Sequence, residues 1–118
     1  MTKIANAPEV YWAIPTQVDA GQPGAAGGER LPDFGYLTEV ARTADTLGFD
    51  GVLIPASGNG LDSLTVASAL APQTRRAKLL AEIRPAAISP SAAARFIATL
   101  DDISGGRAQF VIVTGGQV

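Results

Sequence analysis

The sequence contains neither cysteine nor histidine, so two common kinds of site are excluded at once. Without cysteine there is no disulfide framework and no thiolate metal site. Without histidine the commonest metal ligand and the usual general base near neutral pH are missing. We therefore expect no metal site. If the chain takes part in catalysis, other side chains or a bound cofactor must supply the chemistry.

Excess charge of one sign and long apolar runs are lacking too. The chain carries nine basic and eleven acidic residues with no basic stripe, which argues against binding to nucleic acid. No apolar run reaches the roughly 20 residues needed to span a bilayer, and residues 1–6 lack the apolar core of a signal peptide. We therefore expect a cytoplasmic protein with no nucleic-acid partner and no membrane partner.

What remains is a globular composition whose apolar residues fall into short blocks. Hydrophobic residues make up 47% of the 118 residues, which is enough for one core. Apolar and β-branched blocks predict four strands, at residues 9–15, 51–55, 78–85 and 108–113. Helical periodicity between these blocks predicts three helices, which begin at the N-cap residues Asp33, Asp62 and Ser89.

The third helix and the turn after it carry further expectations. Its apolar residues recur at helical spacing and predict a buried stripe, made of Ala93, Ala94, Phe96, Ile97 and Leu100. Residues 104–107 (SGGR) look superficially like a phosphate cradle. They follow a helix and precede a strand, however, so we expect a helix-ending turn. Arg75 and Arg76 are expected in a solvated connection.

The element order βαβαβαβ, with strands that are apolar throughout, predicts an α/β fold whose parallel sheet is covered on both faces. A dinucleotide-binding unit would need G-x-G-x-x-G soon after the first strand, at the start of a helix. Instead, a long glycine-rich connection follows at residues 16–32, which is typical of a binding loop or lid. We therefore predict the N-terminal half of a (β/α)8 TIM barrel. Residues 1–118 would be an incomplete segment of one barrel domain, because such a barrel takes ~250 residues.

Several blocks in order resemble one protein family. They include residues 12–16 (WAIPT), 51–55 (GVLIP), 84–85 (RP), 89–90 (SP), 104–108 (SGGRA) and 113–115 (VTG). The chain resembles the N-terminal part of the bacterial-luciferase-like, flavin-dependent monooxygenases, and most closely the alkanesulfonate monooxygenases.

This resemblance implies an enzyme that binds reduced FMN supplied by a flavin reductase and uses dioxygen. It also implies cleavage of the carbon–sulfur bond of a small organosulfonate-like substrate to give an aldehyde and sulfite. The family pattern has histidine where this chain has Gln17, cysteine at Gly60, asparagine at Val111 and a small residue at Glu82. These departures bear on sulfonate specificity and on activity.

Candidate site residues follow from the carboxyl ends of the strands, where barrel enzymes bind their ligands. Gln17 is a candidate catalytic residue that would orient substrate or oxygen, although polar residues are also common where a loop begins. Arg84 is a second candidate, able to bind a sulfonate or phosphate through paired hydrogen bonds, with an ion pair to Glu82 as its alternative role. Ser57, Thr114 and Gly115 are candidates for contact with the flavin, and a turn leading into the Asp62 helix is the alternative for Ser57.

Two other functions stay open at this point. The first is a related barrel enzyme that uses a deazaflavin as a hydride carrier. The second is a catalytically inactive half-barrel fragment that self-associates, since a half-barrel leaves a strand edge and barrel-facing side chains exposed. For either function we expect a homo-oligomer.

Overall fold

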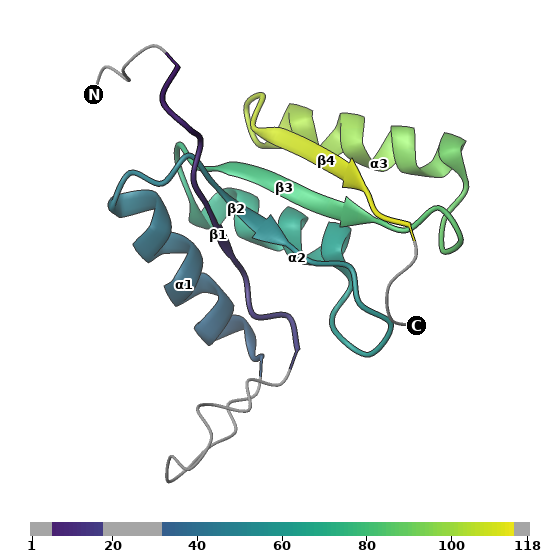
Figure 1. The fold of residues 1–118 in the computed structure, drawn as a ribbon, viewed down its shortest axis with the longest axis horizontal. Helices are drawn as coiled ribbons and strands as arrows, with labels where there is room; N and C mark the ends of the chain where they lie inside the picture. The colour runs from purple at the N-terminus through teal and green to yellow at the C-terminus, as the bar shows by residue number, and fades with distance from the viewer. Residues whose placement is uncertain (1–5, 18–31, 115–118) are drawn as a thin grey trace, which may run out of the picture.

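A computed structural model describes residues 6–17 and 32–114 and contains the predicted alternation of strands and helices (Figure 1). The strands are β1 (Tyr11–Ala13), β2 (Gly51–Ile54), β3 (Lys78–Ile83) and β4 (Ala108–Ile112). The helices are α1 (Phe34–Thr46), α2 (Ser63–Leu70) and α3 (Pro90–Ile103), with a short 3-10 helix, η1 (Ala71–Gln73), after α2. All four predicted strands and all three predicted helices are confirmed. Residues 18–31 of the expected binding loop lie outside the described residues.

The predicted N-caps explain where the helices begin. Asp33, Asp62 and Ser89 each accept a hydrogen bond from a backbone N–H of the first turn, at 2.9, 2.9 and 3.3 Å. Each bond satisfies one of the N–H groups that a helix leaves without an internal partner. After α1, Gly48 adopts a φ of +85°, a left-handed conformation that glycine reaches without a Cβ penalty, and the chain turns into β2.

The sheet is parallel, with strand order β1-β2-β3-β4, so neighbours in the sheet are also neighbours in sequence (Figure 1). In a doubly wound sheet, the order in which successive strands are added reverses at a switch point. No such reversal occurs among these four strands. Consecutive right-handed crossovers in one direction place every helix on the same face. This is the topology of half a (β/α)8 barrel.

One face of the sheet carries the core. The register aligns Val52 with Leu79 and Ile54 with Ala81, and all four side chains are fully buried. They form one cluster with residues from α1, α2 and α3, such as Leu37 and Leu70. All three helices therefore cover this face of the sheet, here called the helix face. The expectation that both faces would be covered is wrong, because singly wound crossovers leave the other face to the interior of a barrel.

On the opposite face, here called the open face, a hydrogen bond between side chains joins the first and last strands of the sheet. The Tyr11 hydroxyl on β1 donates to Gln109 Oε1 on β4 at 2.6 Å, although two strands lie between them. The Tyr11 ring crosses over Gly51, where an added Cβ would lie 2.5 Å from it. Burial first, and then the Glu9 carboxylate, raise the pKa of Tyr11, so the phenol stays protonated as a donor. A bond across two strands requires the sheet to curl toward this face, as the wall of a barrel does.

The predicted apolar stripe of α3 is only partly buried, which corrects the expectation. Leu100 is buried, and Ala93 and Ile97 are partly buried. Phe96 is 53% exposed, and Ala94 is also exposed. The reason is that α3 packs against α2 and β4 on one flank. Its other flank borders an open groove of about 800 Å³ above β4, and no described residue covers that groove.

The amino edge of the sheet, where the strands begin, is tied together by two side chains. Asp45 at the end of α1 accepts hydrogen bonds from the backbone N–H groups of residues 75–77. The Arg107 guanidinium donates five hydrogen bonds, four of them to backbone carbonyls around η1 and at the end of α3. Gly105 and Gly106 have φ values of +70° and +85°, so the predicted helix-ending turn is confirmed. The side chains of Arg75 and Arg76 are exposed, as expected.

Candidate functional site

The carboxyl ends of all four strands meet at one edge of the sheet, here called the carboxyl edge (Figure 1). The described segments that leave this edge are residues 14–17 after β1, 55–62 after β2, 84–89 after β3 and 113–114 after β4. In parallel α/β barrels the catalytic and binding residues come from these segments. The predicted site residues Gln17, Ser57, Arg84 and Thr114 all lie here.

The exits of β1 and β2 are packed directly against each other. The Leu61 backbone N–H donates to the Thr16 carbonyl at 3.0 Å. A Cβ added at Gly60 would lie 2.8 Å from the same carbonyl oxygen and 3.0 Å from Gln17 Cγ. Gly60 therefore permits an approach that a side chain would prevent. The Thr16 side chain is 2% exposed, and its Oγ1 has no hydrogen-bond partner among the described residues.

This packing brings two predicted site residues, Gln17 and Ser57, into contact. Gln17 Nε2 donates to Ser57 Oγ, and also to Asn59 Oδ1 at 3.3 Å. Ser57 Oγ in turn donates to Asn59 Oδ1 at 2.7 Å. The result is a neutral polar network at the carboxyl edge, made of two amides and a hydroxyl. From the sequence, Asn59 could either line the flavin or lie in a turn, and its contact with Gln17 was not predicted because that contact depends on the neighbouring β1 exit.

At the exit of β3, two charged side chains bind the backbone of the same residue of the β2 exit. Glu82 Oε1 accepts from the Ala56 backbone N–H at 3.0 Å, and Arg84 Nε donates to the Ala56 carbonyl at 3.3 Å. The alternative ion pair between Glu82 and Arg84 is not formed in the part of the chain that the structure describes. The sequence shows Glu82 where the family pattern has a small residue. Its hydrogen bond with the Ala56 N–H was not predicted.

A small cavity of about 210 Å³ lies at the same place. Ala56 and Ser57 line it from the β2 exit, Glu82 and Arg84 line it from β3, and Leu61 and Ile88 add apolar surface. The cavity therefore has the Glu82 carboxylate and the Arg84 guanidinium at one end of the sheet, together with neutral hydrogen-bonding groups and the Asp62 carboxylate that caps α2. Such a combination of a few polar groups with apolar walls is typical of small-molecule sites.

The remaining predicted residues lie at the exit of β4. Thr114 is exposed at the carboxyl edge, while Gly115 lies outside the described residues. Val111 pairs with Glu82 in the register and is 39% exposed on the open face. No hydrogen bond joins Thr114 to the Gln17–Ser57–Asn59 network within residues 6–17 and 32–114.

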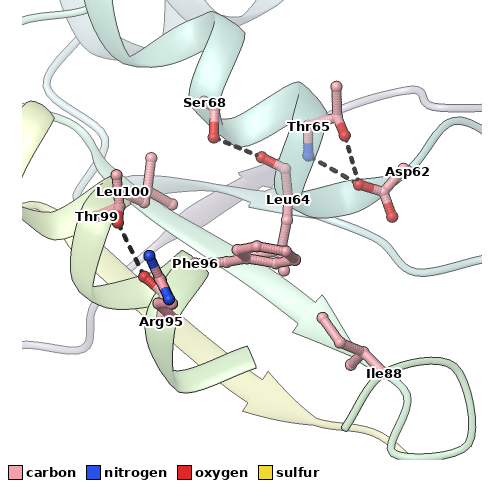
Figure 2. Close-up of a pocket in the computed structure, with 9 residues that line it drawn as sticks. All are labelled: Asp62, Leu64, Thr65, Ser68, Ile88, Arg95, Phe96, Thr99 and Leu100. Carbon is pink, nitrogen blue, oxygen red and sulfur yellow. Dashed lines mark hydrogen bonds between the residues drawn. The ribbon is translucent and has the colours of Figure 1, made fainter. Parts of the chain in front are cut away.

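A second, larger hollow of about 490 Å³ lies on the outside of the fold, between α2 and α3 (Figure 2). Its hydroxyl and carboxylate groups form hydrogen bonds within their own helices. Ser68 donates to the Leu64 carbonyl, Thr99 donates to the Arg95 carbonyl, and Asp62 caps α2. Figure 2 shows Phe96 and Leu64 facing each other across this hollow. It is a groove between packed helices, not a site with converging polar groups.

Two further features of the described residues bear on other functions. No group of three or more acidic residues in these ranges could hold a metal ion. None of the helices in the same ranges is long and apolar enough to cross a membrane.

Comparisons with known proteins agree with this geometry. The family described as "Luciferase-like monooxygenase" matches residues 9–118. A monooxygenase from Streptomyces bottropensis is similar, at 25% identity and a TM-score of 0.67 over 89% of this chain and 32% of that chain. The coenzyme F420-dependent tetrahydromethanopterin reductase from Methanopyrus kandleri is similar at 26% identity and a TM-score of 0.68, covering 92% of this chain and 28% of that chain.

A riboflavin lyase, solved with modified FMN and its substrate riboflavin, shares the fold at 19% identity and a TM-score of 0.71. This match covers 90% of this chain and 30% of that chain. The chain thus spans about a third of the length of the solved structures it matches.

Proposed function

Since the chain belongs to the luciferase-like monooxygenase family, we propose that the whole protein is an FMN-dependent monooxygenase of the alkanesulfonate type. The observation that carries this proposal is the convergence of Gln17, Ser57 and Arg84 at the carboxyl edge of a half-barrel. The similarity to a monooxygenase at 25% identity supports the oxygen-dependent reaction. In the whole protein, residues 1–118 would form the N-terminal segment of a single barrel domain.

The residues at the carboxyl edge fit a flavin-type ring in several respects. The Gln17–Ser57–Asn59 network offers neutral donors and acceptors, and the buried Thr16 Oγ1 beside it is a polar atom without a described partner. Ser57, Thr114 and Gly115 would lie against the cofactor. Reduced FMN, when bound, supplies the two electrons that activate dioxygen. A flavin reductase would supply the reduced FMN.

Arg84 would bind the sulfonate, because a guanidinium matches an oxyanion through paired hydrogen bonds. Gln17 would orient the substrate beside the flavin through its amide. In the overall reaction an alkanesulfonate, dioxygen and reduced flavin give an aldehyde, hydrogen sulfite, water and oxidised flavin. This balance consumes one dioxygen for each carbon–sulfur bond broken. We also propose that the protein is cytoplasmic and forms a homo-oligomer.

A second candidate is a deazaflavin-dependent oxidoreductase, which the 26% identity to a coenzyme F420-dependent reductase favours. The two candidate functions differ in whether the reaction requires dioxygen. We would supply the full-length protein with FMN, a flavin reductase and butane-1-sulfonate, and measure sulfite with and without oxygen. We expect sulfite only when oxygen is present, and a higher KM in Arg84→Lys. Arg95→Lys, on the exposed surface of α3, is the matched control.

Other results would contradict the proposal in distinct ways. Oxygen-independent oxidation of a reduced deazaflavin, without sulfite release, would favour the second candidate. Failure to bind either cofactor would favour a catalytically inactive assembly.

A further inference from the structure

Glu82 is a carboxylate in an unusual place. It lies near the carboxyl end of β3, where alternation puts it on the open face with Leu80, and the register places it beside Val111 of β4. This face is opposite the helices, so in a barrel it is the inner wall. Lys78 and Glu82 are the two charged residues of β3, and Glu82 is only partly exposed.

Only part of the hydrogen-bonding capacity of Glu82 is used. Oε1 accepts from the Ala56 N–H at 3.0 Å, and the Ser63 hydroxyl bonds only to the Glu82 backbone carbonyl. Within residues 6–17 and 32–114, the second carboxylate oxygen has no hydrogen-bond donor, and Glu82 has no ion-pair partner. Among the described residues, no oxygen of Glu82 is both buried and without a partner, so the second oxygen is open to water and available to a ligand in the cavity.

We infer that Glu82 sets the charge class of the substrate and binds its ammonium group. The substrate would be an aminoalkanesulfonate, a zwitterion whose negative end faces Arg84. Glu82 and Arg84 bind the backbone N–H and the carbonyl of one residue, Ala56, and line one cavity of about 210 Å³. A molecule with both charges complements both side chains. This inference rests on the proposed sulfonate chemistry and narrows it to one substrate class.

A simple alkanesulfonate fits this site less well. It has no ammonium group to pair with the Glu82 carboxylate, and its sulfonate brings a second negative charge close to that carboxylate. At a separation on the order of 7 Å and an effective dielectric constant of about 20, like charges lower affinity by roughly 10- to 100-fold. The Arg84 charge offsets part of this effect, so we expect the lower end of that range.

The test compares 3-aminopropane-1-sulfonate with butane-1-sulfonate, which has a methyl group in place of the ammonium group. Full-length protein, FMN, a flavin reductase and oxygen are used, and kcat/KM is measured from sulfite release. We expect a preference of at least roughly 10-fold for the amino compound, mostly through KM. Calorimetric titration of each sulfonate into the FMN complex should show the same order of affinities.

Two variants separate charge from structure. Glu82→Gln keeps an oxygen for the Ala56 N–H but removes the charge, so it should reverse the preference and leave FMN affinity unchanged. Glu82→Ala also removes the acceptor for the Ala56 N–H of the β2 exit and should weaken the binding of both sulfonates. Asp102→Asn, on the exposed end of α3, loses a charge away from the carboxyl edge and should behave like the natural protein.

Distinct results overturn the inference and the function on which it rests. Equal turnover of both sulfonates by the natural protein, or a preference for butane-1-sulfonate, refutes the role of Glu82 and leaves the monooxygenase proposal intact. The same holds if Glu82→Gln keeps the preference, because the carboxylate would then be only a structural acceptor. Absence of FMN binding and of sulfite with either compound refutes both.

Discussion

Asp45 ties the end of α1 to the connection before β3, and its removal should destabilise the fold by a predictable amount. The carboxylate accepts backbone N–H groups of Arg75, Arg76 and Ala77 at 2.8, 3.1 and 2.8 Å. Asp45 is 9% exposed, and Ala77 is buried. Asp45→Ala leaves three donors without their acceptor. At about 1 kcal/mol for each of the two donors that water can reach and about 1 to 3 kcal/mol for the buried Ala77 donor, we expect a loss of about 3 to 5 kcal/mol.

The pH dependence of stability gives a second readout of the same contact. Burial alone would raise the pKa of Asp45, but the N–H groups of Arg75, Ala77 and Arg76 outweigh it, so the pKa is lowered in the folded protein. A carboxyl group whose folded pKa lies below its unfolded value of about 3.9 contributes its full stabilisation above that value. The stabilisation is lost as the pH falls through the folded pKa.

Urea unfolding of the natural protein, Asp45→Ala and Asp45→Asn at several pH values between 7 and 2 measures both effects. Asp45→Asn should lose about half as much as Asp45→Ala at pH 7, because its amide oxygen can still accept. Both variants should lose less additional stability than the natural protein as the pH falls below about 4. A loss below about 0.5 kcal/mol at pH 7, or pH profiles parallel to that of the natural protein, would refute this reasoning.

Three further predictions concern the carboxyl edge, the open face and the amino edge. Gly60→Ala places a Cβ 2.8 Å from the Thr16 carbonyl, so the β1 and β2 exits should separate and FMN affinity should fall; a flavin titration with unchanged affinity would contradict this. Tyr11→Phe removes the bond to Gln109 and should cost about 1 kcal/mol, measured by urea unfolding, whereas no change would mean that the bridge does not hold β1 to β4. Arg107→Met removes five hydrogen bonds and should cost about 3 kcal/mol or more, with unchanged FMN affinity in the protein that remains folded; wild-type thermal stability would refute it.

Local patterns were sufficient to predict most of the fold. The caps at Asp33, Asp62 and Ser89 and the glycine turns at 48 and 105–106 act within a few residues of the chain. These signals do not depend on distant partners, and the element order follows from them. Burial of the α3 stripe failed as a prediction because it depends on what packs against both flanks of a helix. The 53% exposure of Phe96 reflects that dependence.

By itself the sequence determined the alternation of strands and helices, the family, and the edge of the sheet at which Gln17, Ser57 and Arg84 would meet. Periodicity, caps and ordered motifs are properties of neighbouring residues, so they can be read along the chain. Only the tertiary structure decided the contacts across strands. It placed Gly60 against Thr16, joined Asn59 to Gln17, and bound Glu82 and Arg84 to the backbone of Ala56 instead of to each other. The hydrogen bonds among these contacts join residues 26 to 42 positions apart, and they exist only because parallel strands bring their exits to one edge.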